Sequence, residues 1–76
     1  MARAHTKDIL LVKFGVRLRE LRKTARLSQE QLALQSELDR SYVGQVERGE
    51  RNISLKNIGK LARALHVAPA ELFQFP

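Results

Sequence analysis

The sequence predicts an all-α fold of five helices, because signals for helix starts recur along it while signals for strands are nearly absent. β-Branched residues are sparse, and no stretch shows the sustained alternation of a half-buried strand. A helix start is often marked by a polar cap whose preceding apolar residue packs on the fifth residue after it. Three stretches fit this pattern: Leu27, Ser28 and Leu32; Leu38, Asp39 and Val43; and Ile53, Ser54 and Ile58.

The first helix is expected over about residues 6–25, with Thr6 as its cap and Asp8 in its positive first turn. A glycine inside a helix costs about 1 kcal/mol relative to alanine. Either another element approaches closely at Gly15, or this cost is simply tolerated. Five apolar residues recur at helical spacing and are expected to form the core stripe of this helix: Leu10, Phe14, Leu18, Leu21 and Ala25.

The remaining four helices are expected over about residues 29–36, 40–48, 55–65 and 69–74. Ser28 and Gln31 have the spacing of a capping box at the first of these starts. Residues 37–39 form too short a link for two helices to fold back antiparallel with ease, which favours the open crossing of a helix-turn-helix motif. Gly49 is expected to end the helix that follows. Ala68 is a poor cap for the last helix, which favours a helix that depends on a partner for its order.

Composition limits residues 1–76 to a single small domain and favours a polyanionic partner. Fourteen Lys and Arg against eight Asp and Glu give a net charge of +6, although a basic surface can also serve solubility alone. The chain has no cysteine, and its only histidines are His5 and His66. We therefore expect no metal site, no cofactor, no small-molecule ligand and no enzymatic activity. No apolar run is long enough to span a membrane, and a cytoplasmic location is expected.

The stretch from Leu27 to Gly49, LSQEQLALQSELDRSYVGQVERG, resembles the helix-turn-helix of the phage repressor and Cro (XRE) family, with the motif at about residues 28–49. The similarity extends from about Phe14 to Phe73. More narrowly, LDRSYVGQVERGERN resembles the controller proteins of restriction-modification systems, which are short dimeric regulators. The resemblance implies a five-helix, repressor-like domain and a transcriptional regulator that binds double-stranded DNA.

The third predicted helix has an apolar side and a polar side. Leu32, Leu38, Val43 and Val46 have the spacing to fill the space between the second and third helices. The outward face then carries Arg40, Ser41, Gly44, Gln45 and Arg48. This face is expected to enter the major groove, where Arg40 can bind guanine, Gln45 can bind adenine and Ser41 can adapt to several bases. Gly44 either permits close approach to DNA or stands where no side chain is needed.

A second set of polar residues is expected to bind DNA phosphates and to orient the protein without reading sequence. The resemblance places Gln29 at the positive N-terminus of the second helix. The other phosphate candidates are Tyr42, Arg48, Arg51 and Asn52. Two of them have an alternative role, since Tyr42 can be a partly buried ring and Arg51 a solvated loop residue.

Two acidic residues within the motif call for a structural explanation. In the phage repressor branch, an arginine of the first helix pairs with the glutamate at the position of Glu47, and the matching residue here is Arg22. The resemblance therefore implies a structural ion pair between Arg22 and Glu47. Glu37 occupies a turn position where the family often has glycine or asparagine, so the turn is either altered or strained.

Aromatic residues crowd the C-terminal region, where the family resemblance places a dimer interface. Leu72, Phe73 and Phe75 are the expected interface residues of a homodimer, and Ile9, Val12 and Val16 form a second apolar stripe on the first helix. Alternatively, Leu72 and Phe73 cover the core of the monomer. A two-fold dimer binds a pseudo-palindromic operator. Competing functions are a phage or plasmid repressor, an antitoxin, or a protein-interaction module that has lost DNA binding.

Overall fold

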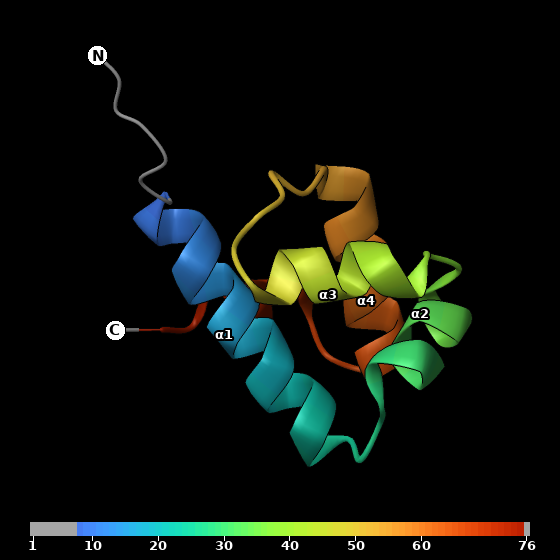
Figure 1. Cartoon of the computed structure of the whole chain (residues 1–76). Helices are drawn as coiled ribbons and strands as arrows, with labels where there is room; N and C mark the ends of the chain where they lie inside the picture. The colour runs from blue at the N-terminus through green and yellow to red at the C-terminus, as the bar shows by residue number, and fades with distance from the viewer. Residues whose placement is uncertain (1–7, 76) are drawn as a thin grey trace.

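The computed structural model describes residues 8–75 and contains, within them, helices and connecting loops but no strand. Four α-helices follow one another: α1 (Ile9–Thr24), α2 (Gln29–Ser36), α3 (Arg40–Glu47) and α4 (Leu55–Leu65). A short 3₁₀ helix, η1 (Pro69–Phe73), completes the fold (Figure 1). The all-α prediction is confirmed, but the count of five α-helices is wrong. Ala68 offers no side-chain acceptor, and the segment tightens into a 3₁₀ turn instead of continuing as an α-helix.

Local hydrogen bonds set most of the helix starts. Ser28 Oγ accepts from the Gln31 backbone N–H at 3.0 Å, and the Ser28 N–H donates to Gln31 Oε1 at 2.8 Å, which completes the predicted capping box. Ser54 caps α4 in the same way through the backbone N–H of Asn57. The cap of α1 is Asp8, whose carboxylate accepts from the Leu10 N–H at 2.8 Å. Thr6, the expected cap, lies outside the described residues.

The start of α3 differs from the prediction in one respect. Asp39 stands at the cap position, yet its side chain makes no capping hydrogen bond. The apolar part of the signal remains, since Val43 is fully buried and Leu38 packs against the core. Hydrophobic packing therefore defines where this helix begins, with the Asp39 carboxylate left exposed.

The turn between α2 and α3 is strained at Glu37. Its backbone adopts the left-handed conformation, with φ 60° and ψ 41°, and the following Leu38 N–H donates to the Ala33 carbonyl at 2.9 Å. A residue with a Cβ in this conformation costs about 1–2 kcal/mol. After α3, Gly49 takes φ 73° without that cost and ends the helix as predicted.

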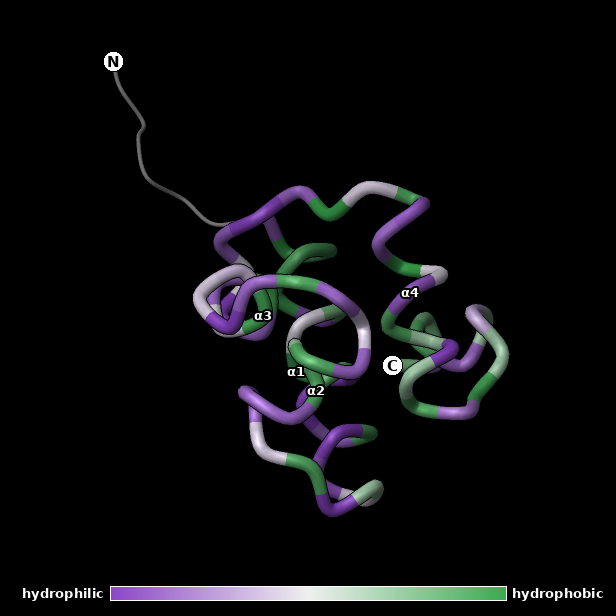
Figure 2. Tube along the Cα trace, turned by 90° about the vertical axis from the view of Figure 1, so that its right-hand side faces the viewer, coloured by the Kyte–Doolittle hydropathy of each residue, from purple (hydrophilic) through white to green (hydrophobic). Residues whose placement is uncertain are grey.

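A single apolar core lies where the helices meet, and each helix contributes one face to it, as the alternating hydropathy along the trace shows (Figure 2). In α1, Phe14 and Leu18 are buried and Leu21 is partly buried. The predicted stripe is wrong at its two ends, because Leu10 is 54% exposed and Ala25 is exposed. The other helices cover the middle of α1 and leave both ends to solvent (Figure 1). No helix among residues 8–75 is long and apolar enough to cross a membrane.

Gly15 lies where α1 crosses the end of α3. A Cβ at this position would stand 2.4 Å from the Val46 carbonyl oxygen and 2.5 Å from that of Glu47. No side chain fits there, so the close approach of a neighbouring element is the reason for the glycine. The crossing fixes the distance between the first helix and the third.

Candidate nucleic-acid interface

The helix α3 presents a polar face to solvent because its opposite face is buried. Val43 and Val46 are at most 1% exposed, and they face the core with Glu47 beside them. Arg40 and Ser41 are exposed and Gln45 is half-buried, which leaves the three predicted base-reading residues on the accessible side of the helix. This side can therefore meet base edges without any rearrangement of the core.

Gly44 is buried, although it was expected on the outward face without a side chain over it. A Cβ there would lie 3.2 Å from Arg48 Nη1 and 3.6 Å from Gln29 Oε1. The side chains of Arg48 and Gln29 thus lie over the glycine and occupy the space in front of it. Spacing along α3 alone could not reveal this cover, because Gln29 comes from another helix.

Arg22 and Glu47 form the ion pair that the sequence analysis expected. Arg22 Nε donates to Glu47 Oε2 at 2.6 Å, and Nη2 donates to Oε1 at 3.1 Å. Both residues are buried, with exposures of 8% and 7%. Arg22 Nη1 also donates to the Leu27 carbonyl at 2.9 Å. The pair joins α1 to α3 and holds the Glu47 carboxylate on the buried side of α3.

Gln29, a predicted phosphate contact, has its side chain engaged within the protein. Its Nε2 donates to Glu47 Oε1 at 3.0 Å, so this amide joins α2 to the same carboxylate that Arg22 holds. Every buried side-chain nitrogen and oxygen of the described residues has a hydrogen-bond partner. Gln29 is nevertheless the first residue of α2, so its backbone N–H belongs to the positive end of that helix.

Tyr42 connects α3 with the neighbouring helix and loop. Its hydroxyl accepts a hydrogen bond from Asn57 Nδ2 of α4 at 3.1 Å, and the guanidinium of Arg51 lies over its ring, 4.9 Å from the centroid. The ring is partly buried, and Arg51 and Asn52 are exposed in the loop before α4. Sequence reasoning missed Asn57. The available signal was its position three residues after the Ser54 cap, which places its side chain at the exposed start of α4.

Arg48 follows α3 and forms a surface ion pair. Its Nε lies 3.2 Å from Glu50 Oε2, and the two side chains are 57% and 42% exposed. Such exposed pairs contribute about 0–1 kcal/mol. The guanidinium of Arg48 therefore lies at the surface beside α3.

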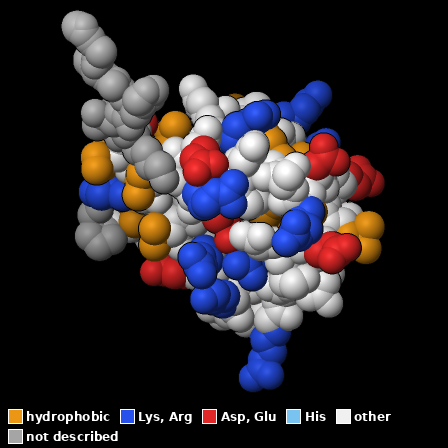
Figure 3. All heavy atoms as spheres, viewed as in Figure 1, with side chains coloured by type: hydrophobic (Ala, Val, Ile, Leu, Met, Phe, Trp, Pro, Cys, Tyr) orange, Lys and Arg blue, Asp and Glu red, His pale blue; other side chains and the backbone are white. Residues whose placement is uncertain are grey.

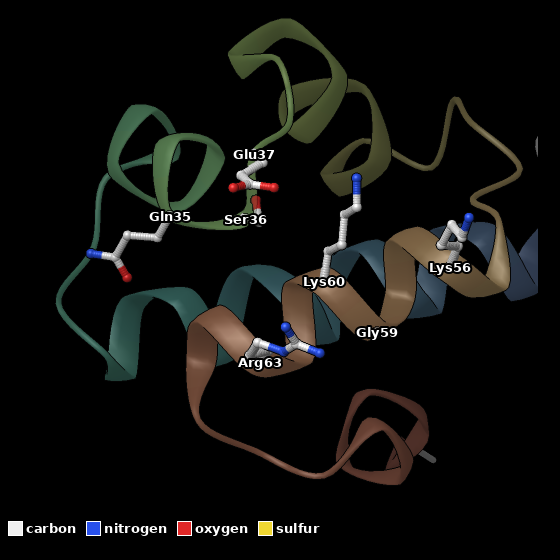
Figure 4. A pocket seen from close by; sticks show the side chains of 7 residues that line it. All are labelled: Gln35, Ser36, Glu37, Lys56, Gly59, Lys60 and Arg63. Atoms are coloured by element: carbon white, nitrogen blue, oxygen red, sulfur yellow. The ribbon is translucent and has the colours of Figure 1, made fainter.

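Basic side chains gather on the face that carries α3 (Figure 3). An open groove of about 530 Å³ lies between the end of α2 and α4, and Figure 4 shows Lys56, Lys60 and Arg63 along its α4 side. None of the described carboxylates forms an ion pair with these three cations. Glu37 lies on the opposite wall of the groove. The positive charge of the domain thus extends from α3 along α4.

The end of the molecule that was expected to form a dimer interface is partly apolar and exposed. Leu72 is fully buried in the core, so its assignment to the interface is wrong and its alternative role, covering the monomer core, holds. Phe73 is 45% exposed and contacts the Phe14 ring at a centroid distance of 5.3 Å, and Phe75 is partly buried. On α1, Ile9 and Val16 are 66% and 51% exposed.

A second groove of about 320 Å³ separates α1 from the C-terminal segment, with Val12, Val16 and Phe75 among its lining residues. Arg17 Nε donates to the Glu71 carbonyl at 2.9 Å and ties η1 to α1. The exposed apolar residues of α1 and η1 therefore belong to one end of the molecule, held together by this bond and by the contact of Phe73 with Phe14.

Comparison with known proteins identifies the family. The family model described as Helix-turn-helix matches residues 18–72. The control protein C.BamHI of Bacillus amyloliquefaciens is 44% identical over 71 residues, which are 92% of this chain and 86% of that protein. The control protein C.MunI of Mycoplasma sp is 44% identical over 63 residues, 82% of this chain and 85% of that protein.

Solved structures agree with these matches. The structure of the restriction-modification controller protein C.AhdI from Aeromonas hydrophila has a TM-score of 0.82 and 70% sequence identity, and the match covers 83% of this chain and 96% of that one. The resemblance expected from the motif is therefore confirmed at both levels. The chain belongs to the helix-turn-helix family of transcription regulators and, within it, to the control proteins of restriction-modification systems.

Proposed function

We propose that this protein is a dimeric regulator of a restriction-modification operon that binds a pseudo-palindromic operator with α3 in the major groove. The observation that carries the proposal is the orientation of α3. Its inner face is held by the buried pair of Arg22 with Glu47 and by the crossing at Gly15, while Arg40 and Ser41 are exposed. A rigidly held helix with an accessible polar first turn is what major-groove reading requires.

The proposed base contacts follow from the chemistry of the exposed side chains. Arg40 donates two parallel hydrogen bonds to O6 and N7 of a guanine, and Gln45 pairs with N6 and N7 of an adenine. Ser41 lies next to Arg40 and donates or accepts according to the base that it meets. These three residues determine which sequence is bound.

The proposed phosphate contacts surround the base contacts. They are the backbone N–H at Gln29, the Tyr42 hydroxyl, and the side chains of Arg48, Arg51 and Asn52. The positive end of α2 and the cations on the α3 face support this assignment. Such contacts act alike on all sequences and make binding depend steeply on salt.

Dimerisation is proposed to occur through Phe73 and Phe75 together with the exposed apolar residues of α1. Single exposed apolar residues are common, but several at one end of a small domain favour an interface. A two-fold dimer places its two α3 helices about 34 Å apart, one turn of DNA.

The proposal is tested by selecting bound sequences from a random duplex library with the full chain. The expected result is a pair of inverted half-sites with centres about one DNA turn apart, bound with an affinity that falls linearly on a log–log plot against salt. A protein that enriches no sequence but binds random duplexes would be a non-specific binder. A protein that binds no duplex would fit an interaction module and contradict the proposal.

A further inference from the structure

Asn57 lies on α4 and contacts the proposed DNA interface through its hydrogen bond to the Tyr42 hydroxyl. We infer that Asn57 is a positioning residue for DNA binding: by donating to the Tyr42 hydroxyl oxygen, it directs the phenolic proton outward, where a DNA phosphate accepts it. The inference rests on the proposed function, because it needs a phosphate to lie against Tyr42.

The local structure holds the backbone of Asn57, and one hydrogen bond orients its side-chain amide. Asn57 occupies the third position of α4, and its backbone N–H is held by Ser54 Oγ at 3.1 Å. The side chain then reaches across to α3, where Nδ2 meets the Tyr42 hydroxyl at 3.1 Å. The donor lies on α4 and the acceptor on α3, and both helices pack against α2. This packing holds the two residues in place relative to each other.

The direction of this hydrogen bond decides what the hydroxyl can do next. A phenol has one proton to donate, and its oxygen can also accept. When the Asn57 amide donates, it occupies the oxygen and leaves the phenolic proton for another acceptor. The hydrogen bond from Asn57 also polarises the Tyr42 hydroxyl, which makes this hydroxyl a better donor. Tyr42 is thereby prepared to donate to a phosphate rather than to accept from one.

Arg51 supplies the charge beside this donor. Its guanidinium lies 4.9 Å from the centroid of the Tyr42 ring, on the ring face. Arg51 is an exposed residue of the loop before α4. Tyr42 and Arg51 together present one neutral donor and one charged donor to an approaching anion, and Asn57 holds the neutral one in place.

The inference is tested by a double-mutant cycle with Tyr42→Phe, Asn57→Ala and the double variant, using the full chain and a random-sequence duplex. A random duplex suffices because phosphate contacts do not depend on sequence. We expect Tyr42→Phe to weaken binding about tenfold, which corresponds to about 1.4 kcal/mol. Asn57→Ala is expected to weaken it about threefold in the wild-type background and less than twofold in the Tyr42→Phe background, since the bond it directs is then already lost.

A third substitution tests the direction of the hydrogen bond. Asn57→Asp replaces the donor by a carboxylate that can only accept, which draws the phenolic proton inward. It is expected to weaken binding more than Asn57→Ala does. In the Tyr42→Phe background, Asn57→Asp is expected to weaken binding more than Asn57→Ala only through its added negative charge. A salt titration identifies this charge effect. An equal excess in both backgrounds would contradict the stated direction.

Controls separate this role from a structural one. Gln35→Ala removes an exposed amide on α2 and is expected to leave affinity unchanged. Urea unfolding of each variant gives the coupling free energy between Tyr42 and Asn57 in the folding of the protein. The coupling free energy of the same two residues in DNA binding must be larger than this value. In the free protein, the NMR signal of the Asn57 side-chain amide is expected to shift on Tyr42→Phe, and an unmoved signal would show that the hydrogen bond is absent.

Different results would overturn the proposed function and the role of Asn57. A wild-type chain that binds no duplex overturns the proposed function and this inference with it. A wild-type chain that binds DNA while Asn57→Ala has no effect, or the same effect in both backgrounds, overturns only the role of Asn57.

Discussion

Replacing Glu47 by alanine removes the carboxylate on which α1, α2 and α3 converge. Three hydrogen bonds are lost, two from Arg22 at 2.6 and 3.1 Å and one from Gln29 at 3.0 Å. The Arg22 guanidinium stays behind, buried and without its anion. Removing one partner of a buried ion pair destabilises a protein by about 3–5 kcal/mol. The total stability expected for a chain of this length is only about 4–11 kcal/mol.

The double variant Arg22→Met/Glu47→Leu gives the opposite expectation. Apolar residues of similar volume fill the site without a stranded charge, and such replacements are often neutral or stabilising. The double variant is therefore expected to be more stable than either Arg22→Met or Glu47→Leu alone, each of which keeps the side-chain volume but leaves one buried charge without its partner. The reversal identifies stranded charge, rather than lost packing, as the cause of the large single-variant effects.

Urea unfolding followed by circular dichroism measures these effects. Glu20→Ala is the matched control, because Glu20 pairs with Arg17 at 3.4 Å on the surface with its side chain 61% exposed. The control is expected to lose less than about 1 kcal/mol. If Glu47→Ala were equally mild, the pair would contribute nothing specific to holding α3, and this explanation of the motif would be wrong.

The remaining predictions concern the turn, the helix crossing and the proposed dimer. Gly15→Ala is expected to destabilise by about 2–3 kcal/mol, because its methyl group meets backbone carbonyls of α3. Gly59→Ala, which meets no atom within 4 Å in the middle of α4, is expected to stabilise by about 0.5–1 kcal/mol in the same urea assay. Glu37→Asn should raise stability by about 0.5–1 kcal/mol by relieving the left-handed strain, and a lower urea midpoint would contradict this. Phe73→Ser should shift the dimer towards monomer in analytical ultracentrifugation, while Leu34→Ser, an exposed residue of α2, should not.

The sequence predicted the helix starts well because capping and the adjacent apolar contact are local. Ser28 and Gln31 lie three residues apart, and no distant residue is needed to complete their two hydrogen bonds. The buried face of α3 also followed from local spacing. Val43 and Val46 are buried as expected, and Arg40 is exposed at the first position of α3.

Features that depend on distant residues were beyond such reasoning. Helical spacing placed Leu10 in the core stripe, but whether a stripe is covered depends on which elements pack over it, and none covers Leu10 fully. The cover over Gly44 could not be predicted, because the side chain of Gln29 that forms part of it belongs to another helix. The hydrogen bond between Tyr42 and Asn57 joins residues 15 apart in sequence through a turn and a loop.

The central claim is that α3 reads the operator through Arg40. The most direct test measures the affinities of wild type, Arg40→Ala and Arg48→Ala for the selected operator, for single-base variants of it and for a random duplex, all at one salt concentration. Arg40→Ala is expected to cost about 1–3 kcal/mol on the operator and to relax preference at one base pair per half-site. Arg48→Ala should weaken binding to every duplex alike. If Arg40→Ala left the ratio of operator to random affinity unchanged, Arg40 would not be a base-reading residue.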